Sequence, residues 1–195
     1  MIDTAEMLRS FHPYRGNAIV VPGRGGRHWV GISKLPNRDA PLGDPSMGGH
    51  ASFALGLALA RPNEKVVVFD SEGDLMMSLG VLATVAEQRP KNFYHFLLDN
   101  ECYATTGGQP VPNAKNVHYD ALARGAGYPA AYAYDNLESF AINVERILAG
   151  EGPVFVALKV TPEVNNTPIG QRKKWQTRRP VEALGDLRRE LGIAG

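Results

Sequence analysis

The chain has 195 residues, a formal net charge of +1, and ordinary globular proportions of 44% hydrophobic and 21% charged residues. This length allows one well-packed domain and is short for two. The charge gives no bulk attraction to nucleic acid or to a membrane surface, and the single cysteine, Cys102, excludes a disulfide framework and fits a reducing cytoplasm. We therefore expect a cytoplasmic protein with neither nucleic acid nor a membrane as partner.

The first sixty residues predict two helices, one strand and a long loop. Residues 4–11 have the spacing of a short amphipathic helix, for which Thr4 is the expected N-cap. Residues 17–21 form an apolar run typical of a buried strand, followed by a glycine-rich loop that carries Arg24 and Arg27. One helical turn is expected at 28–32, irregular structure at 34–46, and a helix of small residues at 53–60.

The rest of the chain alternates apolar runs with segments of helical periodicity. Strands are predicted at 65–70, 93–98, 130–134 and 153–160, and helices at 75–89, 120–127, 137–148 and 181–191. The strand at 153–160 is almost wholly apolar, so we expect a central place for it in the sheet. This alternation indicates an α/β fold with a doubly wound, mainly parallel sheet and helices on both faces.

The composition changes after Val160. Residues 161–180 are polar, with basic runs at 172–174 and 178–179. We therefore expect one domain at 1–160. Residues 161–195 should form a charged C-terminal extension that ends in a helix.

Two polar turns follow neighbouring strands of the predicted sheet. Asp70-Ser71-Glu72-Gly73-Asp74 follows the first of them, and Asp99-Asn100-Glu101-Cys102 follows the second. The carboxyl ends of parallel strands meet at one edge of a sheet, so these turns offer oxygen ligands for a hard divalent cation. Gly73 lets the backbone approach a phosphate bound at the N-terminus of the next helix. The alternative is that these acidic and amide residues only cap helices.

Six segments follow one another along the chain in a fixed order. They are Met47-Gly48, Ala54 to Pro62, Lys65 to Val68, Leu75 to Thr84, Leu98-Asp99-Asn100 and Thr106-Gly107-Gly108-Gln109-Pro110. In this order they resemble the pyrophosphate-binding domain of thiamine diphosphate enzymes. The resemblance is closest to the phosphonopyruvate and sulfopyruvate decarboxylase group, over roughly residues 15 to 160.

The resemblance implies that Mg²⁺ is held by Glu72, Asn100 and the backbone carbonyl of Cys102, and that the metal holds the diphosphate of the cofactor. The expected cofactor-binding residues are Ser46, Met47, Gly48, Ser71, Glu72, Gly73, Asp74, Asn100, Thr105, Thr106 and Gly107. The sequence departs from the family at one point, because Ser71-Glu72-Gly73 replaces Gly-Asp-Gly. Glutamate reaches about one methylene further than aspartate, so either the metal affinity changes or a shifted loop lets Asp74 contribute.

Other polar residues have a functional and a structural interpretation each. His50 is the candidate catalytic residue. It lies at a helix start, where the resemblance places the thiazolium ring of the cofactor, and it could move a proton or bind a substrate anion. The alternative is that His50 only makes a local hydrogen bond at the helix start. We expect His95, in the middle of a strand, to be a packed or edge residue.

Five basic residues could bind a doubly charged substrate: Arg24, Arg27, Arg172, Lys173 and Lys174. The alternative for this basic set is a solvated surface or a contact with a partner subunit.

The family's cofactor-activating glutamate lies on a separate pyrimidine-binding domain, for which 195 residues leave no room. The resemblance therefore implies a β-type subunit that pairs with a pyrimidine-binding α-type subunit in a hetero-oligomer such as a heterotetramer. The implied activity is that of a lyase, a 2-oxoacid decarboxylase that uses thiamine diphosphate and Mg²⁺.

Three alternatives to this activity remain. One is a carboligase similar to acetolactate synthase, and another is a degenerate, non-catalytic cofactor domain. The third is the β subunit of a 2-oxoacid:ferredoxin oxidoreductase, which the lack of a cysteine cluster disfavours.

Overall fold

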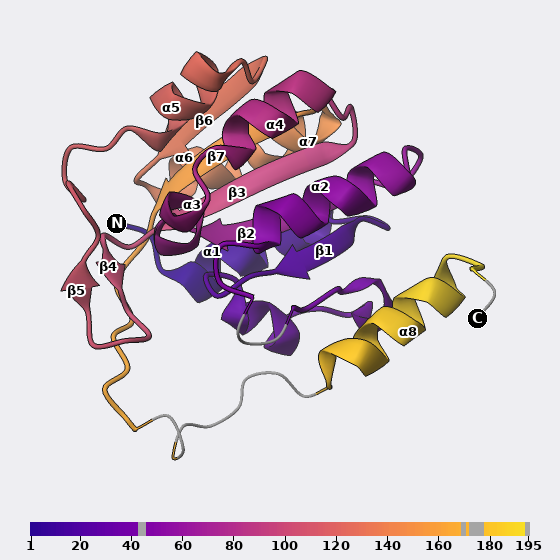
Figure 1. The fold of residues 1–195 in the computed structure, drawn as a ribbon, viewed down its shortest axis with the longest axis horizontal. Helices are drawn as coiled ribbons and strands as arrows, with labels where there is room; N and C mark the ends of the chain where they lie inside the picture. Colours follow the sequence, from indigo (N-terminus) through magenta and orange to yellow (C-terminus); the bar gives the residue numbers. More distant parts are fainter. Residues whose placement is uncertain (43–45, 169–170, 172–177, 194–195) are drawn as a thin grey trace.

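The computed structural model describes residues 1–42, 46–168, 171 and 178–193 (Figure 1). Its centre is a five-stranded, wholly parallel sheet of order β1-β2-β3-β7-β6. The strands are β1 (Ile19–Pro22), β2 (Val66–Ser71), β3 (Phe93–Asp99), β6 (Ala130–Tyr134) and β7 (Val154–Lys159). The predicted doubly wound parallel sheet is confirmed. The apolar strand β7 lies inside the sheet between β3 and β6, while β3 occupies its middle.

Eight α-helices and three short 3-10 helices surround the sheet in the described part of the chain. The α-helices are α1 (Thr4–Phe11), α2 (His50–Ala60), α3 (Glu72–Met77), α4 (Val81–Gln88), α5 (Tyr119–Ala126), α6 (Leu137–Ala141), α7 (Val144–Ala149) and α8 (Pro180–Glu190). The 3-10 helices are η1 (His12–Tyr14), η2 (Arg27–Gly31) and η3 (Pro36–Arg38). Two short strands, β4 (Cys102–Tyr103) and β5 (Gln109–Pro110), form a separate antiparallel pair.

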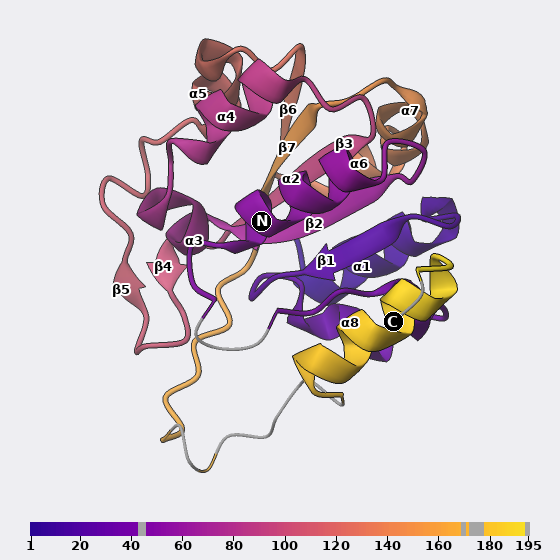
Figure 2. The ribbon, with the colours of Figure 1, turned by 45° about the vertical axis from the view of Figure 1, so that its right-hand side comes forward.

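Helices cover both faces of the sheet, and each face has its own apolar core (Figures 1 and 2). Val66 and Val68 of β2 belong to the core shared with α2, α4 and α5, whereas Val67 and Phe69 belong to the core shared with α1, α6 and α7. All four side chains are fully buried. Side chains alternate between the faces of a strand, so an interior strand can be apolar throughout.

Two predicted helices are each divided in two. The segment at 75–89 breaks at residues 78–80, and α3 already begins at Glu72, because the hydroxyl of Ser71 accepts a hydrogen bond from the Asp74 amide (3.4 Å). The segment at 137–148 breaks before Val144, where the side chain of Asn143 donates to the Ser139 carbonyl (2.8 Å). Side-chain bonds of this kind compete with a continuous helix.

The ends of the chain also differ in detail from the sequence prediction. Asp3, and not Thr4, caps α1, since its carboxylate accepts a hydrogen bond from the Glu6 amide (2.9 Å). Helix α8 packs against η3, where Ala183 is buried, and places Leu187 in the core of the α2 face (Figure 2). The basic residues predicted at 172–174 lie outside the described residues. Within the described ranges, no helix is both long and apolar enough to cross a membrane.

Candidate metal and diphosphate site

The two polar turns meet at the carboxyl edge of the sheet. Strand β2 ends at Ser71 and β3 ends at Asp99, and the two strands are paired in parallel up to Ser71 and Leu98. The residues that follow, Glu72 and Asn100, therefore leave the sheet side by side. Both reach the same backbone amide, that of Cys102, which donates to Glu72 Oε1 (3.1 Å) and to Asn100 Oδ1 (3.0 Å).

Glu72 is the most unusual side chain of this edge. It is 1% exposed, and its second carboxylate oxygen, Oε2, is buried without a hydrogen-bond partner among the described residues. Burial raises the pKa of Glu72 to about 7, and the negative charge of Asp99 adds to this increase. Hydrogen bonds from backbone amides lower the pKa but do not outweigh the burial. A nearby cation would supply the missing partner and favour the ionised form.

The donor set fits a hard divalent cation. Glu72 offers a carboxylate oxygen, Asn100 an amide oxygen and Cys102 a backbone carbonyl, all of them oxygen ligands. The Cys102 carbonyl already accepts a hydrogen bond from the Ala104 amide (3.0 Å), and a carbonyl oxygen has a second lone pair for a metal. The unpartnered Glu72 Oε2 is the observation that makes a cation fit here.

The segment from Ser46 to Gly48 is attached directly to α3. Gly48 has φ of +77°, and its amide donates to Asp74 Oδ1 (3.3 Å) while its carbonyl accepts from the Ser78 hydroxyl (2.5 Å). A Cβ at Gly48 would lie 3.1 Å from the Cβ of Met77. The loop and the helix that carries Glu72 are thus held in one arrangement.

A cavity of about 180 Å³ lies beside these elements. Its lining includes Ser71, Gly73, Asp74, Asn100, Cys102, Met47, Met77, Leu98, Thr105, Thr106, Arg24, Arg27 and Glu163. A Cβ at Gly73 would approach the Tyr103 ring to 3.0 Å, so glycine keeps this wall of the cavity close to the backbone. Neither Glu72 nor His50 is among the described residues that line it, and neither are Ser46, Gly48 and Gly107.

One wall of the cavity carries two arginines. The guanidinium of Arg24 donates to the hydroxyl of Thr105 (3.4 Å). Arg27 pairs with Glu163, whose carboxylate also contacts His28 Nε2 at 2.8 Å. Burial alone would raise the pKa of Glu163, but the hydrogen bonds from Arg27 and His28 outweigh it and lower that pKa. Sequence reasoning found the arginines but missed Glu163, which follows β7 and belongs to no motif.

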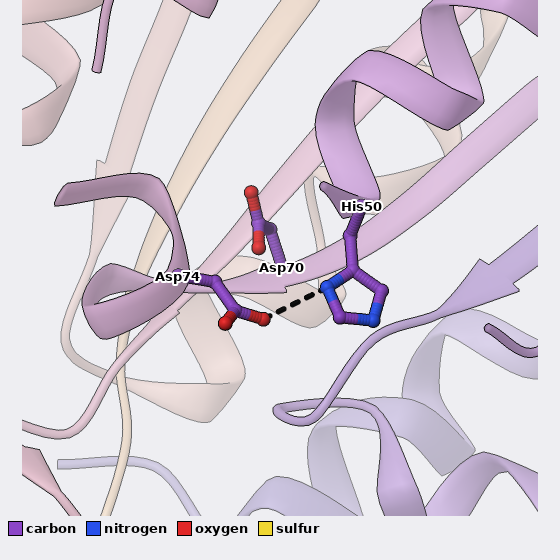
Figure 3. Close-up of side chains that lie close together, drawn as sticks. All are labelled: His50, Asp70 and Asp74. Atoms are coloured by element: carbon purple, nitrogen blue, oxygen red, sulfur yellow. Dashed lines mark ion pairs between the residues drawn. The ribbon is translucent and has the colours of Figure 1, made fainter. Parts of the chain in front are cut away.

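A second group of buried polar side chains lies where α2, β2 and α3 meet (Figure 3). His50 Nδ1 is 2.8 Å from Asp74 Oδ2, and Asp70 lies next to this pair. Asp70 Oδ2 is in turn 3.1 Å from Nε2 of His95, a fully buried side chain of β3. The structure thus places His50 against α3 rather than in the cavity lining, and His95 in the core, as its packed interpretation anticipated.

Comparisons with known proteins identify the family of the chain and several relatives. A family model described as "Thiamine pyrophosphate enzyme, C-terminal TPP binding domain" matches residues 30–158. The chain is 41% identical over 143 residues to the sulfopyruvate decarboxylase subunit beta of Methanothermobacter thermautotrophicus, covering 73% of this chain and 72% of that protein. It is 38% identical over 117 residues to the phosphonopyruvate decarboxylase of Streptomyces hygroscopicus, covering 60% of this chain but only 29% of the relative.

A solved structure shares the fold at low identity. The benzoylformate decarboxylase of Polynucleobacter necessarius superposes with a TM-score of 0.67 at 16% identity, over 83% of this chain and 33% of that one. At this identity the likeness shows the fold alone.

Proposed function

Because the chain belongs to the thiamine pyrophosphate enzymes, through their C-terminal TPP-binding domain, we propose that it is the cofactor- and Mg²⁺-binding subunit of a two-chain 2-oxoacid decarboxylase. The proposed substrate resembles sulfopyruvate or phosphonopyruvate, the 2-oxoacids in the names of its relatives. The single observation that carries the site assignment is the buried, unpartnered Oε2 of Glu72, a carboxylate whose Oε1 shares the Cys102 amide with Asn100 Oδ1.

In this proposal Glu72, Asn100 and the Cys102 carbonyl hold Mg²⁺, and the metal and the backbone of residues 46–48 and 71–74 hold the diphosphate. When bound, thiamine diphosphate supplies a thiazolium that accepts the electron pair left by the departing CO₂. The chain's own part is to fix the diphosphate end. Gly73 brings the backbone close, and Asp74 and Ser78 hold Gly48 in place.

The remaining walls of the cavity suit an acidic substrate. Arg24 and Arg27 line this cavity, and Arg27 is paired there with Glu163, which an acidic substrate would have to displace or share. Guanidinium groups bind carboxylate, sulfonate and phosphonate oxygens in a bidentate manner. Met47, Met77 and Leu98 supply apolar surface, which keeps water from the cofactor. Thr105 and Thr106 add hydroxyl donors at the same cavity.

The active site is completed by a partner in this proposal. Relatives named as beta subunits support a pyrimidine-binding α-type subunit that carries the activating glutamate. The assembly is then a cytoplasmic hetero-oligomer such as a heterotetramer.

The proposal is tested by reconstitution. The purified chain is mixed with an α-type sulfopyruvate decarboxylase subunit, thiamine diphosphate and Mg²⁺, and release of CO₂ from sulfopyruvate and from phosphonopyruvate is measured. We expect turnover with both chains and none with either alone. Turnover by this chain alone would overturn the two-chain assignment, and a carboligated product in place of the aldehyde would favour the reaction of acetolactate synthase. Glu72→Gln with the same partner is the matched control and should be inactive.

A further inference from the structure

The buried group at the junction of α2, β2 and α3 combines one imidazole with two carboxylates. His50 is the first residue of α2, Asp70 lies near the end of β2, and Asp74 lies in α3. One ligand atom from each lies within 4.8 Å of the other two. The three side chains are each at most 3% exposed. Three separate elements therefore direct charged groups into one small volume of the interior (Figure 3).

The polar atoms of this group divide into satisfied and unsatisfied ones. Asp70 Oδ1 accepts from the Ser71 amide (2.9 Å), and Asp70 Oδ2 lies 3.1 Å from His95 Nε2. Asp74 Oδ1 accepts from the Gly48 amide (3.3 Å). By contrast, His50 Nδ1 and Asp74 Oδ2 are 2.8 Å apart without the alignment of a hydrogen bond, and neither has another partner among the described residues. The two atoms therefore form a close ion pair, but neither has the aligned hydrogen bond that buried polar atoms usually make.

A cation between these atoms resolves both the charge and the geometry. Asp74 lies against His50 and Asp70 against His95, and a divalent ion would neutralise both carboxylates without requiring either imidazole to be protonated. We propose that His50 Nδ1, Asp70 and Asp74 Oδ2 bind a divalent transition-metal ion, with Zn²⁺ as the reference ion, at a site separate from the Mg²⁺ site at Glu72. Three protein ligands of this kind leave one position of a tetrahedral zinc ion for water.

The surroundings supply the supporting contacts that metal ligands require. Ligating carboxylates are held by further hydrogen bonds, which fix their orientation. His95 Nε2 contacts Asp70 Oδ2, and the Gly48 amide donates to Asp74 Oδ1. Each carboxylate has further lone pairs, so these contacts and an ion can be accommodated together. An ion at this place would join α2, β2 and α3 and would hold the loop at Gly48 against the helix of Glu72.

The imidazole distinguishes this site from the oxygen-only site at Glu72. Mg²⁺ takes oxygen ligands, whereas imidazole suits zinc and its neighbours in the first transition series. The inference concerns metal binding alone and stands whether or not the proposed decarboxylase activity is found.

The test uses the full chain stripped with a chelator and then dialysed. Co²⁺, a spectroscopic substitute for Zn²⁺, is titrated in the presence of excess Mg²⁺, and its visible ligand-field absorption is recorded. We expect one equivalent to bind and Zn²⁺ to displace it. Asp74→Asn, which keeps an acceptor for the Gly48 amide, and His50→Gln should each abolish the band. His95→Phe should weaken binding by about 10- to 100-fold.

Two matched variants locate the ion. Glu72→Gln removes the oxygen-only site, and His28→Gln removes a partly exposed histidine paired with Glu163, so both should leave the band unchanged. No band in the wild-type chain, a band that survives Asp74→Asn, or loss of the band in His28→Gln would overturn the proposal. If the interior variants do not fold, X-ray absorption of the Zn²⁺-loaded wild type still decides. One imidazole with oxygen ligands is expected, and oxygen ligands alone or several imidazoles would refute it.

Discussion

Helix α3 brings two carboxylates to two different surroundings. Glu72 reaches the turn after β3, where Cys102 and Asn100 meet, while Asp74 reaches Gly48 and His50 at the start of α2. Residues two apart on a helix point in roughly opposite directions, so one short helix can serve two sites without sharing a ligand. The acidic turn is thus not one cluster in which either carboxylate replaces the other. The turn instead contributes to two different groups of side chains, and we propose a separate metal site at each, one with oxygen donors only and one with an imidazole.

Removal of a ligand at the oxygen-only site should have the largest effect. Asn100→Ala deletes one of three proposed metal ligands, and we expect Mg²⁺-dependent retention of thiamine diphosphate to be lost. The fall in affinity should exceed the roughly 100-fold that follows when a residue supporting a metal ligand is removed. Retention is measured by equilibrium dialysis with and without Mg²⁺, after circular dichroism has shown that the variant is folded. Unchanged retention would remove Asn100 from the metal site, and Thr106→Ala on the same cavity is a milder control.

The second prediction uses the pH dependence of Glu72. The pKa of its carboxyl is about 7 in the folded, metal-free protein against an ordinary 4.5, so the folded state binds more protons between these values. Stability should therefore fall as the pH rises from 4.5 to 7, by about 3 kcal/mol from this group. Urea unfolding in EDTA should show this slope in the wild type but not in Glu72→Gln. Equal slopes in the two proteins would mean that burial does not disfavour the ionised form of Glu72.

The imidazole site gives a third prediction of similar size. Zn²⁺ at 100 times its dissociation constant should raise the unfolding free energy of the wild type by about 2.7 kcal/mol. Asp74→Asn should lose this gain. In chelator this variant should stay within about 1 kcal/mol of the wild type, because asparagine can still accept from the Gly48 amide and brings no buried charge. A loss of 3–5 kcal/mol in chelator would instead identify His50 and Asp74 as a simple buried ion pair.

The smallest effect is expected where the two sites are joined. Ser78→Ala deletes the hydroxyl that donates to the Gly48 carbonyl, and one such bond is worth about 1 kcal/mol. We expect affinity for thiamine diphosphate, measured with Mg²⁺ by calorimetry, to fall about fivefold. Thr84→Ala is the control, since that hydroxyl bonds only within the neighbouring helix. If both variants behave alike, the loop at Gly48 does not position the cofactor.

The strands and the meeting of the two turns were predictable from the sequence. Buried strands have continuous apolar runs, and the parallel topology requires that Glu72 and Asn100 leave the sheet at one edge. The break between α3 and α4 was not predictable, because the hydroxyl of Ser78 bonds to Gly48, thirty residues away.

The imidazole site was hidden for the same reason. His50 lies at a helix start and His95 in the middle of a strand. The sequence alone does not show that an aspartate from another element faces each of them. Asp70 and Asp74 are recognised from the sequence only as members of the acidic turn. Glu163 reaches the cavity from a loop after β7 and has no motif to mark it. Such contacts depend on the packing of distant elements, which local patterns do not specify.

The central claim is that this chain binds thiamine diphosphate through a metal held by Glu72 and Asn100. Calorimetric titration of the cofactor into the purified chain, with Mg²⁺ and with EDTA, alone and with the α-type subunit, tests it most directly. We predict binding that requires Mg²⁺, tightens with the partner and disappears in Glu72→Gln. Binding in EDTA, or no binding in any of these conditions, would contradict the account and indicate that only the fold was retained.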